Sequence, residues 1–357
     1  MTTRRASKPR VTLVDVARLA AVDKAIVSRV VNEDRTLVIR PETRERVVEA
    51  IQRLGYRPNI AARSLRTAKA GTLGLVIPDF ANPVYAEIIT GAESAALDRG
   101  HVLVAGSSSG TRSSSMDRYL DLLGQGRVDG LLLAGPTTAR EHQKLQSLGL
   151  PWMMVNRRDT GDHHRYVILD DAQAAKLAVE HLLSLGHRRI GHVAGPAATD
   201  TAKRRAAGYR QAMKTAGIAV RPIDIARGDY TPGGGAQAMS GLLDKGVAPT
   251  AVFVANVAMA VGVLDTLRRA GLRVPQDVSV VAVHDLPLAE HLNPPLTTVR
   301  MPLQELGARA VELLLSRSSD EQVTEVVSAS MELVPRESTS PPPILYAGEP
   351  LADPHLH

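Results

Sequence analysis

The stretch TLVDVARLAAVDKAIVSRVVN, residues 12–32, contains two short amphipathic segments separated by the tight join AAVD. Asp23 is suited to cap the second segment as a helix, and Val22 provides an apolar plug within the join. The apolar residues recur at helical spacing on one face of each segment: Leu13, Val16, Ala17 and Ala20, then Val27, Val30 and Val31. This pattern predicts a helix-turn-helix.

The second predicted helix carries small and polar side chains on the face opposite its valines. Arg29 can pair bidentately with a guanine edge, and Lys24 lies near the helix end that reaches bases in a major groove. One such helix alone is also compatible with an ordinary amphipathic helix whose outer face is solvated. The face comprises Lys24, Ala25, Ser28, Arg29 and Asn32.

The basic charge of the chain is confined to its N-terminal fifth. Residues 1–69 contain 16 Lys and Arg against seven Asp and Glu, whereas the whole 357-residue chain has a formal net charge of only +6. A small basic domain attached to a near-neutral remainder indicates a polyanionic partner such as nucleic acid. The absence of cysteine excludes disulfides and thiolate metal sites. Because no bilayer-spanning apolar run and no signal peptide are visible, we expect a soluble cytoplasmic protein.

A third helix is predicted within RPETRERVVEAIQRLGYRP, with Pro41 in its first turn and Gly55 as its C-cap. Its expected core stripe is Val47, Val48, Ile51 and Leu54. Three small helices then share one core. Asn59 can cap a further helix of roughly two turns, which is too short to be stable alone in water.

The ordered runs DVARLAAVDKAIVSRVVN, RPETRERV and LGYRPNIAARSLRT resemble the headpiece and hinge of the lactose-repressor/galactose-repressor (LacI/GalR) family of transcription regulators. The resemblance implies that the hinge helix forms on operator DNA, that Leu65 wedges into the minor groove, and that Arg66 contacts the groove or a phosphate. In the alternative interpretation, Leu65 only anchors the hinge against the next domain. The predicted DNA-binding set is Lys24, Ala25, Ser28, Arg29, Asn32, Asn59, Leu65 and Arg66.

The chain departs from the family pattern at several headpiece positions. Ala21 replaces a usual turn glycine, Asp23 and Arg40 replace usual serines, and Ile26 replaces a usual threonine. Asp23 and Ile26 weaken the expected phosphate contacts, so operator affinity is expected to change while the fold is kept.

After Gly71, apolar runs such as TLGLVI, DGLLLAG and TAVFVAN alternate with helical stretches. This alternation predicts an α/β fold with doubly wound parallel sheets covered on both faces, and more than 260 residues allow two such units. Because open parallel sheets bind ligands beyond their carboxyl ends, the polar residues that follow the strands predict a binding cleft. Each of these residues taken singly is also compatible with a helix cap or a loop salt bridge.

The same region resembles the two-lobed, periplasmic-binding-protein-like effector domain of that family, up to about Pro335. Arginine, carboxylate, amide, hydroxyl and aromatic groups suit a polyhydroxylated ligand such as a sugar, while a nucleobase or a sugar phosphate stays open. Without a ligand, Arg205 and Asp285 are alternatively expected to pair across the cleft. Val257 stands where the family usually has aspartate. The predicted effector-binding set is Asp79, Tyr85, Asp170, Thr201, Arg205, Tyr230, Asn256 and Asp285.

Motifs of the common enzyme classes are missing. The sequence has no G-x-G-x-x-G after a strand, no P-loop, no G-x-S-x-G and no H-E-x-x-H, and His163 and His164 have no partners at metal-ligand spacing. We therefore expect no catalysis, no cofactor and no metal. The competing classes are a sugar-binding transport-type protein, which would need a signal peptide and no basic headpiece, and an enzyme on the same fold.

The sequence as a whole predicts a DNA-binding repressor whose operator affinity is modulated by a small polar effector. We expect a homodimer, because the C-terminal region lacks the leucine heptads that make the lactose repressor a tetramer, and a near-palindromic operator. The predicted segments are a headpiece over residues 1–57, a hinge over 58–70, an effector domain over 71–335 and a disordered tail over 336–357. Within the effector domain, the N-lobe covers about 71–169 and 301–330, and the C-lobe covers about 170–300 and 331–335.

Overall fold

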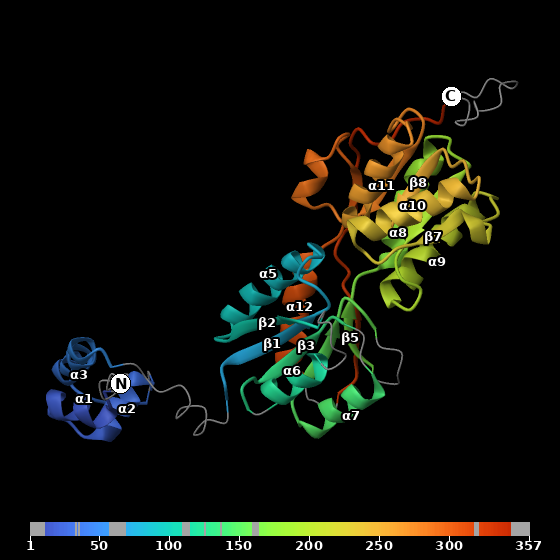
Figure 1. Ribbon diagram of the computed structural model, residues 1–357. Helices are drawn as coiled ribbons and strands as arrows, with labels where there is room; N and C mark the ends of the chain where they lie inside the picture. Colours follow the sequence, from blue (N-terminus) through green and yellow to red (C-terminus); the bar gives the residue numbers. More distant parts are fainter. Residues whose placement is uncertain are drawn as a thin grey trace, which may run out of the picture. The chain divides into compact units, whose positions relative to one another are not determined.

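The structure is a computed structural model, which describes residues 11–32, 34, 36–56, 69–108, 115–124, 126–135, 138–158, 164–317 and 321–343. The chain divides into two compact units, Met1–Ala70 and Gly71–His357. Each unit is described by itself. We refer to the first unit as the headpiece and to the second as the effector domain (Figure 1).

The described part of the headpiece contains three helices: α1 (Leu13–Ala20), α2 (Lys24–Val31) and α3 (Pro41–Leu54). Thr12 and Asp15 form a capping box at the start of α1, and the Asp23 carboxylate accepts from the Ala25 amide at the start of α2. The helices enclose one small apolar core. Its buried residues are Val16, Ala17, Ala20, Val27, Val30, Leu37, Val47 and Ala50.

Three local features of the headpiece carry a cost in stability or differ from expectation. Ala21 ends α1 in the left-handed region, at φ 50° and ψ 49°, where a side chain is unfavourable. Arg40 provides no side-chain cap for α3. Val48, which we predicted in the core, is 41% exposed, because the helix turns Val47 and Ala50 inward instead.

The described residues of the effector domain form two six-stranded sheets. The N-lobe sheet has the strand order β11-β5-β4-β3-β1-β2, and all of its neighbouring strands are parallel. Its strands are β1 (Thr72–Ile77), β2 (Val102–Ser107), β3 (Gly130–Leu133), β4 (Trp152–Val155), β5 (Arg165–Ile168) and β11 (Val323–Val326). The helices of this lobe are α5 (Val84–Leu97), α6 (Ser115–Leu123), α7 (Ala139–Ser147) and α12 (Leu303–Ser316).

The C-lobe sheet has the order β12-β10-β9-β8-β6-β7, and only β12 runs antiparallel to its neighbour. Its strands are β6 (Ile190–Ala194), β7 (Ile225–Arg227), β8 (Ala251–Val254), β9 (Ser279–Val283), β10 (Thr297–Arg300) and β12 (Glu332–Val334). Its α-helices are α8 (Asp171–Ser184), α9 (Asp200–Thr215), α10 (Pro232–Asp244) and α11 (Val257–Arg269). Short 3-10 helices lie at Pro222–Asp224 and Pro287–His291.

The chain passes between the lobes three times, after β5, after β10 and after β11. As a result, α12 from the C-terminal part of the sequence packs along α5 of the N-lobe (Figure 1). A Cβ added at Gly91 of α5 would lie 1.8 Å from the Gln304 carbonyl oxygen, and one at Gly307 of α12 would lie 2.0 Å from the Ile88 carbonyl oxygen. Glycine at both positions therefore allows the two helix backbones to touch.

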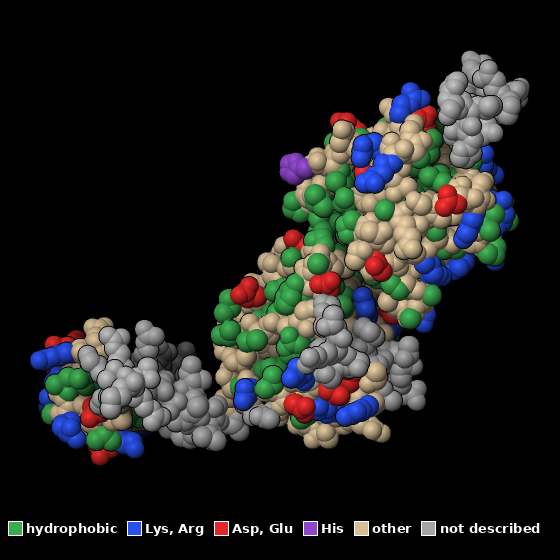
Figure 2. Space-filling model, viewed as in Figure 1, with side chains coloured by type: hydrophobic (Ala, Val, Ile, Leu, Met, Phe, Trp, Pro, Cys, Tyr) green, Lys and Arg blue, Asp and Glu red, His purple; other side chains and the backbone are tan. Residues whose placement is uncertain are grey.

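The N-lobe exposes several apolar side chains near the end of α5 and along one face of the edge strand β2. Leu97, Val102 and Val104 are each about half exposed. Figure 2 shows hydrophobic side chains gathered over α5 and β2. Such a patch is typical of a protein-protein contact surface.

Residues 336–343, which we predicted to belong to a disordered tail, are part of the described structure. Ser338 is fully buried; its hydroxyl donates to the Val280 carbonyl at 2.6 Å and accepts from the Thr297 amide at 2.8 Å. The Ser340 carbonyl lies 2.8 Å from His187 Nε2. The prediction was wrong for these residues because composition does not reveal polar side chains that bond to strand ends. Residues 344–357 lie outside the described residues.

Candidate functional site

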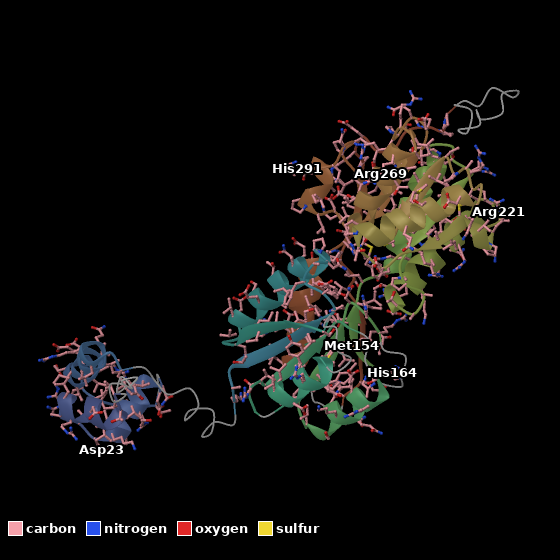
Figure 3. The ribbon with its side chains drawn as sticks, viewed as in Figure 1. Asp23, Met154, His164, Arg221, Arg269 and His291 are labelled. Carbon is pink, nitrogen blue, oxygen red and sulfur yellow. The ribbon has the colours of Figure 1, made fainter. Side chains whose placement is uncertain are left out.

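Helix α2 presents the predicted DNA-reading face. Its valines, Val27 and Val30, are buried, whereas Lys24, Ala25 and Arg29 are exposed and Ser28 and Asn32 are half-buried. Figure 3 labels Asp23, the capping residue at the beginning of this helix. The opposition of apolar and polar faces leaves the side chains that the sequence singled out available on the headpiece surface.

Arg29 has internal partners on this surface. Its Nε lies 2.7 Å from Asp34 Oδ2, and one terminal nitrogen donates to the Thr36 hydroxyl at 2.9 Å. Hydrogen bonds from Thr36 and Arg29 lower the pKa of Asp34 to about 2, so that carboxylate is ionised at neutral pH. DNA must therefore compete with Asp34 for the Arg29 guanidinium. The predicted contacts at Asn59, Leu65 and Arg66 lie outside the described residues.

In the effector domain, Arg205 of α9 is a predicted effector residue that is bonded to three other residues. It is 2% exposed, and its Nε lies 2.7 Å from Asp171 Oδ1. Its terminal nitrogens donate to the Ala255 carbonyl at 2.5 Å and contact His284 Nε2 at 3.0 Å. These partners follow β5, β8 and β9, so Arg205 connects the carboxyl ends of several strands.

Tyr230 lies beside this arginine cluster on the C-lobe. Its hydroxyl is 2.9 Å from the Thr201 hydroxyl and 3.1 Å from that of Thr199. Its carbonyl accepts from the Asn256 amide group at 3.4 Å, while the Asn256 oxygen caps α11. The replacement of the usual aspartate by Val257 leaves this cap intact, because Val257 is a buried apolar residue that begins the helix.

Tyr85, at the start of α5, is a predicted effector residue of the N-lobe. Burial raises the pKa of its phenol, and the guanidinium groups of Arg157 and Arg205 and a hydrogen bond with Asn156 oppose the rise. The neighbouring Tyr230 raises the pKa of Tyr85 as well. Tyr85 and Asn156 of the N-lobe therefore lie close enough to Arg205 and Tyr230 of the C-lobe for electrostatic interaction, as the sequence predicted for residues lining one cleft.

The three predicted carboxylates have other partners. Asp79 accepts from the Ala81 amide within its own turn, and Asp170 is the exposed cap of α8. Asp285 binds Arg336 at 2.7 Å and Arg300 at 2.6 Å. Burial would raise the pKa of Asp285, but hydrogen bonds from Arg336, Thr298 and Arg300 lower it.

The alternative in which Arg205 pairs with Asp285 is therefore wrong. Arg205 pairs with Asp171, which also forms an ion pair with Arg204. Sequence reasoning missed Asp171, His284 and Arg157. Asp171 is adjacent to the predicted Asp170, and His284 is adjacent to the predicted Asp285, so the sequence indicated the right turns and only the side-chain direction distinguished the neighbours. Arg157 is one of the polar residues that follow a strand.

Polar contacts join the two lobes beside this site. Arg158 after β4 pairs with Asp200 of α9 at 3.1 Å. Arg204 pairs with the same carboxylate at 2.9 Å and donates to the Asn156 and Leu169 carbonyls. Helix α9 thus carries both the interlobe contacts and Arg205.

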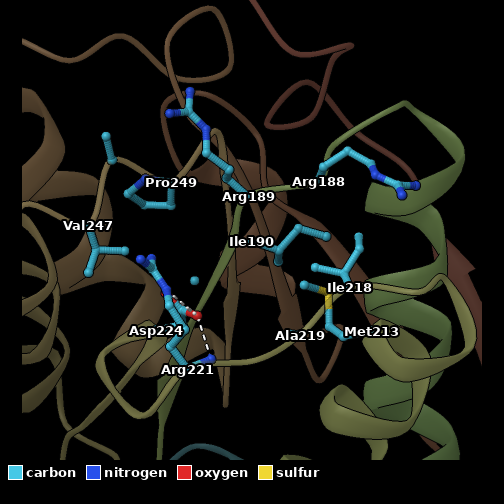
Figure 4. A pocket seen from close by; sticks show the side chains of 12 residues that line it. Arg188, Arg189, Ile190, Met213, Ile218, Ala219, Arg221, Asp224, Val247 and Pro249 are labelled. Atoms are coloured by element: carbon cyan, nitrogen blue, oxygen red, sulfur yellow. Dashed lines mark hydrogen bonds and ion pairs between the residues drawn. The ribbon is translucent and has the colours of Figure 1, made fainter.

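A separate cavity of about 280 Å³ lies at the opposite, amino ends of β6 and β8 (Figure 4). Ile190, Met213 and Pro249 form part of its apolar lining, and Arg188, Arg189 and Arg221 lie around it. Arg221 is paired with Asp224 at 2.7 Å. This cavity contains none of the predicted effector residues.

Membrane spans and metal sites are further features that would indicate a function. No helix within the described part of the chain is long and apolar enough to cross a membrane. Within the same ranges, no group of three or more histidine and carboxylate side chains is arranged to hold a metal ion. Neither result points to a site beyond those already described.

Two family comparisons match the two units separately. Residues 12–59 match the family described as bacterial regulatory proteins, lacI family, and residues 179–339 match a periplasmic binding protein-like domain. The "Ribose operon repressor" of Escherichia coli (strain K12) is 37% identical over 308 residues, covering 86% of this chain and 92% of that protein. "Catabolite control protein A" of Priestia megaterium is 34% identical over 332 residues, covering 92% of this chain and 99% of that protein.

Solved structures agree over nearly the whole chain. The complex described as "transcriptional regulator CelR-cellobiose complex" has 34% identity and a TM-score of 0.71, covering 92% of this chain and 100% of that chain. The lac repressor dimer bound to operator and the anti-inducer ONPF has 29% identity and a TM-score of 0.82, covering 93% and 100%. Since headpiece and effector domain match together, the comparisons favour a regulator over a transport-type binding protein. The chain belongs to the lacI family of bacterial regulatory proteins and is a DNA-binding transcriptional regulator.

Proposed function

We propose that the protein is a repressor whose operator affinity is modulated by a small polar effector bound between the lobes, with no enzymatic role. The observation that best supports this site is that residues with an unfavourable backbone conformation are concentrated in it. Of the four described non-glycine residues with positive φ, three are Asn156, Tyr230 and His284, which bond to or neighbour Tyr85, Thr201 and Arg205. Such strain is typical of ligand-binding sites, because the surrounding structure must maintain it.

We propose a sugar as the effector class. The hydroxyl of Thr201, the amide of Asn256 and the ring of Tyr230 can bond and stack against a polyhydroxylated ring. The relatives include a ribose operon repressor and a regulator in complex with cellobiose, which supports the same class here. Asp79, Asp170 and Asp285 enter this proposal as positioning residues, because their carboxylates are already bonded within the protein.

On the DNA side, α2 would enter the major groove with the face formed by Lys24, Ala25, Ser28, Arg29 and Asn32. The exposed patch of Leu97, Val102 and Val104 (Figure 2) supports association of two copies, and a solved relative is a dimer bound to operator. Such a dimer would bind a near-palindromic operator in the cytoplasm. Effector and DNA would then be linked by a coupling free energy of about 1–3 kcal/mol.

The test is selection of a binding site from palindromic operator libraries at fixed salt, with and without a panel of sugars that includes ribose and cellobiose. We expect one symmetric site to be enriched and its affinity to shift with a subset of the panel. Lys24→Ala should weaken the selected site, whereas Arg140→Gln, on an N-lobe side chain that is 83% exposed, should not. Enrichment of no site under any condition would contradict the proposal.

A further inference from the structure

Arg157 is a buried cation that has no counter-ion among the residues that the structure describes. It follows β4, is only 8% exposed, and makes no hydrogen bond or ion pair with any residue that the structure describes; its Nε is a buried donor without a partner. The other two buried arginines of the described chain are bonded, Arg165 to the Trp152 carbonyl and Arg205 to Asp171. Burying an unpaired charge is costly, so a group that is absent from the free protein is expected to compensate Arg157.

Arg157 lies near the residues of the proposed effector site. The positive charges of Arg157 and Arg205 both lower the pKa of the Tyr85 phenol, which lies at the start of α5. Arg205 in turn contacts His284, and Tyr230 also acts on Tyr85. Arg157 therefore belongs to the same cluster of side chains as the residues proposed to bind the effector.

His284 supplies a second buried donor. Its Nε2 is 3.0 Å from an Arg205 nitrogen, which can only donate, so Nε2 must be the acceptor. Burial, with Arg205 nearby, lowers the pKa of His284 well below its ordinary value, so the ring is neutral and its proton is on Nδ1. That Nδ1 is buried and has no hydrogen-bond partner among the described residues.

The described carboxylates nearest to this cluster are bonded to other groups. Asp171 is paired with Arg204 and Arg205, Asp285 is paired with Arg300 and Arg336, and Asp170 caps α8. A neutral sugar would bring hydroxyl oxygens and leave the charge of Arg157 uncompensated. A carboxylate or phosphate would satisfy both the charge and the donors, because a guanidinium binds either group bidentately.

We propose that the effector is an anionic sugar derivative, whose carboxylate or phosphate group binds Arg157 and receives a hydrogen bond from His284 Nδ1. This inference rests on the proposed function, because it specifies the ligand of the same site. The anion would then lie between Arg157 of the N-lobe and His284 of the C-lobe. Thr201, Tyr230 and Asn256 would bond the hydroxyl groups in exchange for part of their present contacts with one another.

The first experiment uses inorganic phosphate as the probe. Thermal unfolding of the full chain is followed in phosphate and in chloride at equal ionic strength, for the unmodified protein, Arg157→Gln and the control Arg140→Gln. We expect phosphate to raise the unfolding midpoint of the unmodified protein and of the control, but not that of Arg157→Gln. Without phosphate, Arg157→Gln should unfold about 2–4 °C higher, because it removes an unpaired buried charge.

The second experiment is calorimetric titration with matched neutral and anionic sugars: glucose, gluconate and glucose 6-phosphate. We expect gluconate or glucose 6-phosphate to bind and glucose not to bind, and Arg157→Gln to weaken the anionic ligand by about 10- to 100-fold. Arg157→Lys keeps the positive charge but loses the planar guanidinium that binds an anion bidentately, so it should retain part of the affinity. Gluconate and glucose 6-phosphate distinguish a carboxylate from a phosphate.

Equal responses of the unmodified protein and Arg157→Gln to phosphate and to both anionic sugars would overturn the inference, and so would a lower unfolding midpoint of Arg157→Gln in chloride. Binding of glucose with unchanged affinity in Arg157→Gln would also overturn it and leave the proposed sugar-responsive regulator standing. Failure of the operator selection, with the anion response intact, would instead reject the proposed function alone.

Discussion

Ala21→Gly is expected to stabilise the headpiece. Ala21 is an exposed residue held at φ 50° and ψ 49° at the end of α1, and its amide bonds to carbonyls of that helix, so the conformation is fixed. An L-residue in this region carries about 1–2 kcal/mol of strain, which glycine relieves, while the unfolded chain becomes more flexible and offsets part of the gain. The net stabilisation should be about 0.5–1 kcal/mol.

Hydrogen exchange of the α1 and α3 amides in the full chain measures this effect within the headpiece. A gain of this size corresponds to a roughly two- to fivefold increase in protection. Ala25→Gly is the matched control, because Ala25 is also exposed but lies within α2; there glycine should lower protection, by about 0.5 kcal/mol in free energy. If both variants lowered protection alike, left-handed strain at Ala21 would be refuted.

Four further predictions concern DNA binding, the effector site and pH. Asp34→Asn should free Arg29 and tighten operator binding by about 3–10-fold at low salt, with a steeper salt dependence; an unchanged affinity in a filter-binding assay would contradict the competition between Asp34 and DNA. Leu65→Ala should weaken specific operator binding far more than nonspecific binding, and equal losses would exclude the wedge role. Tyr230→Phe removes the hydroxyl that contacts two threonines and should cost about 1 kcal/mol, measured as a lower midpoint in calorimetry, whereas an unchanged midpoint would show those contacts to be unimportant. Burial lowers the pKa of His192 from its ordinary value of 6.5 to about 3. At a pH between these two values, the unfolded chain therefore binds a proton at His192 and the folded protein does not. Stability should therefore fall by about 2 kcal/mol between pH 7 and pH 5, and urea titrations of His192→Gln should show a smaller fall.

Much of the fold follows from local patterns in the sequence. Asp23, Pro41 and Gly55 mark helix ends that the structure confirms, because caps depend only on the residue and its nearest amides. The central strands, such as Gly130–Leu133 and Ala251–Val254, were visible as continuous apolar runs because both of their faces are covered. The edge strand Val102–Ser107 was also visible, although its valines are exposed.

The site was harder to predict because it depends on which of two adjacent residues faces inward. Asp170 and Asp171 have the same side chain, but Asp170 caps the helix and Asp171 binds Arg205. His284 and Asp285 divide in the same way, with the histidine on Arg205 and the aspartate on Arg336. A register difference of one residue is set by the strand pleat and the following turn, and a motif alone does not fix either.

The division of the N-lobe between two distant parts of the chain has a consequence for biosynthesis. Its sheet is completed by Val323–Val326, and α5 is covered by Leu303–Ser316, yet the preceding strand of the same sheet ends at Ile168. At the usual rate of translation, the intervening stretch of roughly 155 residues takes roughly 8–30 s to emerge from the ribosome. During that interval the C-lobe is being synthesised while the face of α5 around Gly91 has no covering helix. The nascent chain is therefore most exposed to aggregation in the first-made lobe, and slower translation of the second lobe would lengthen that exposure.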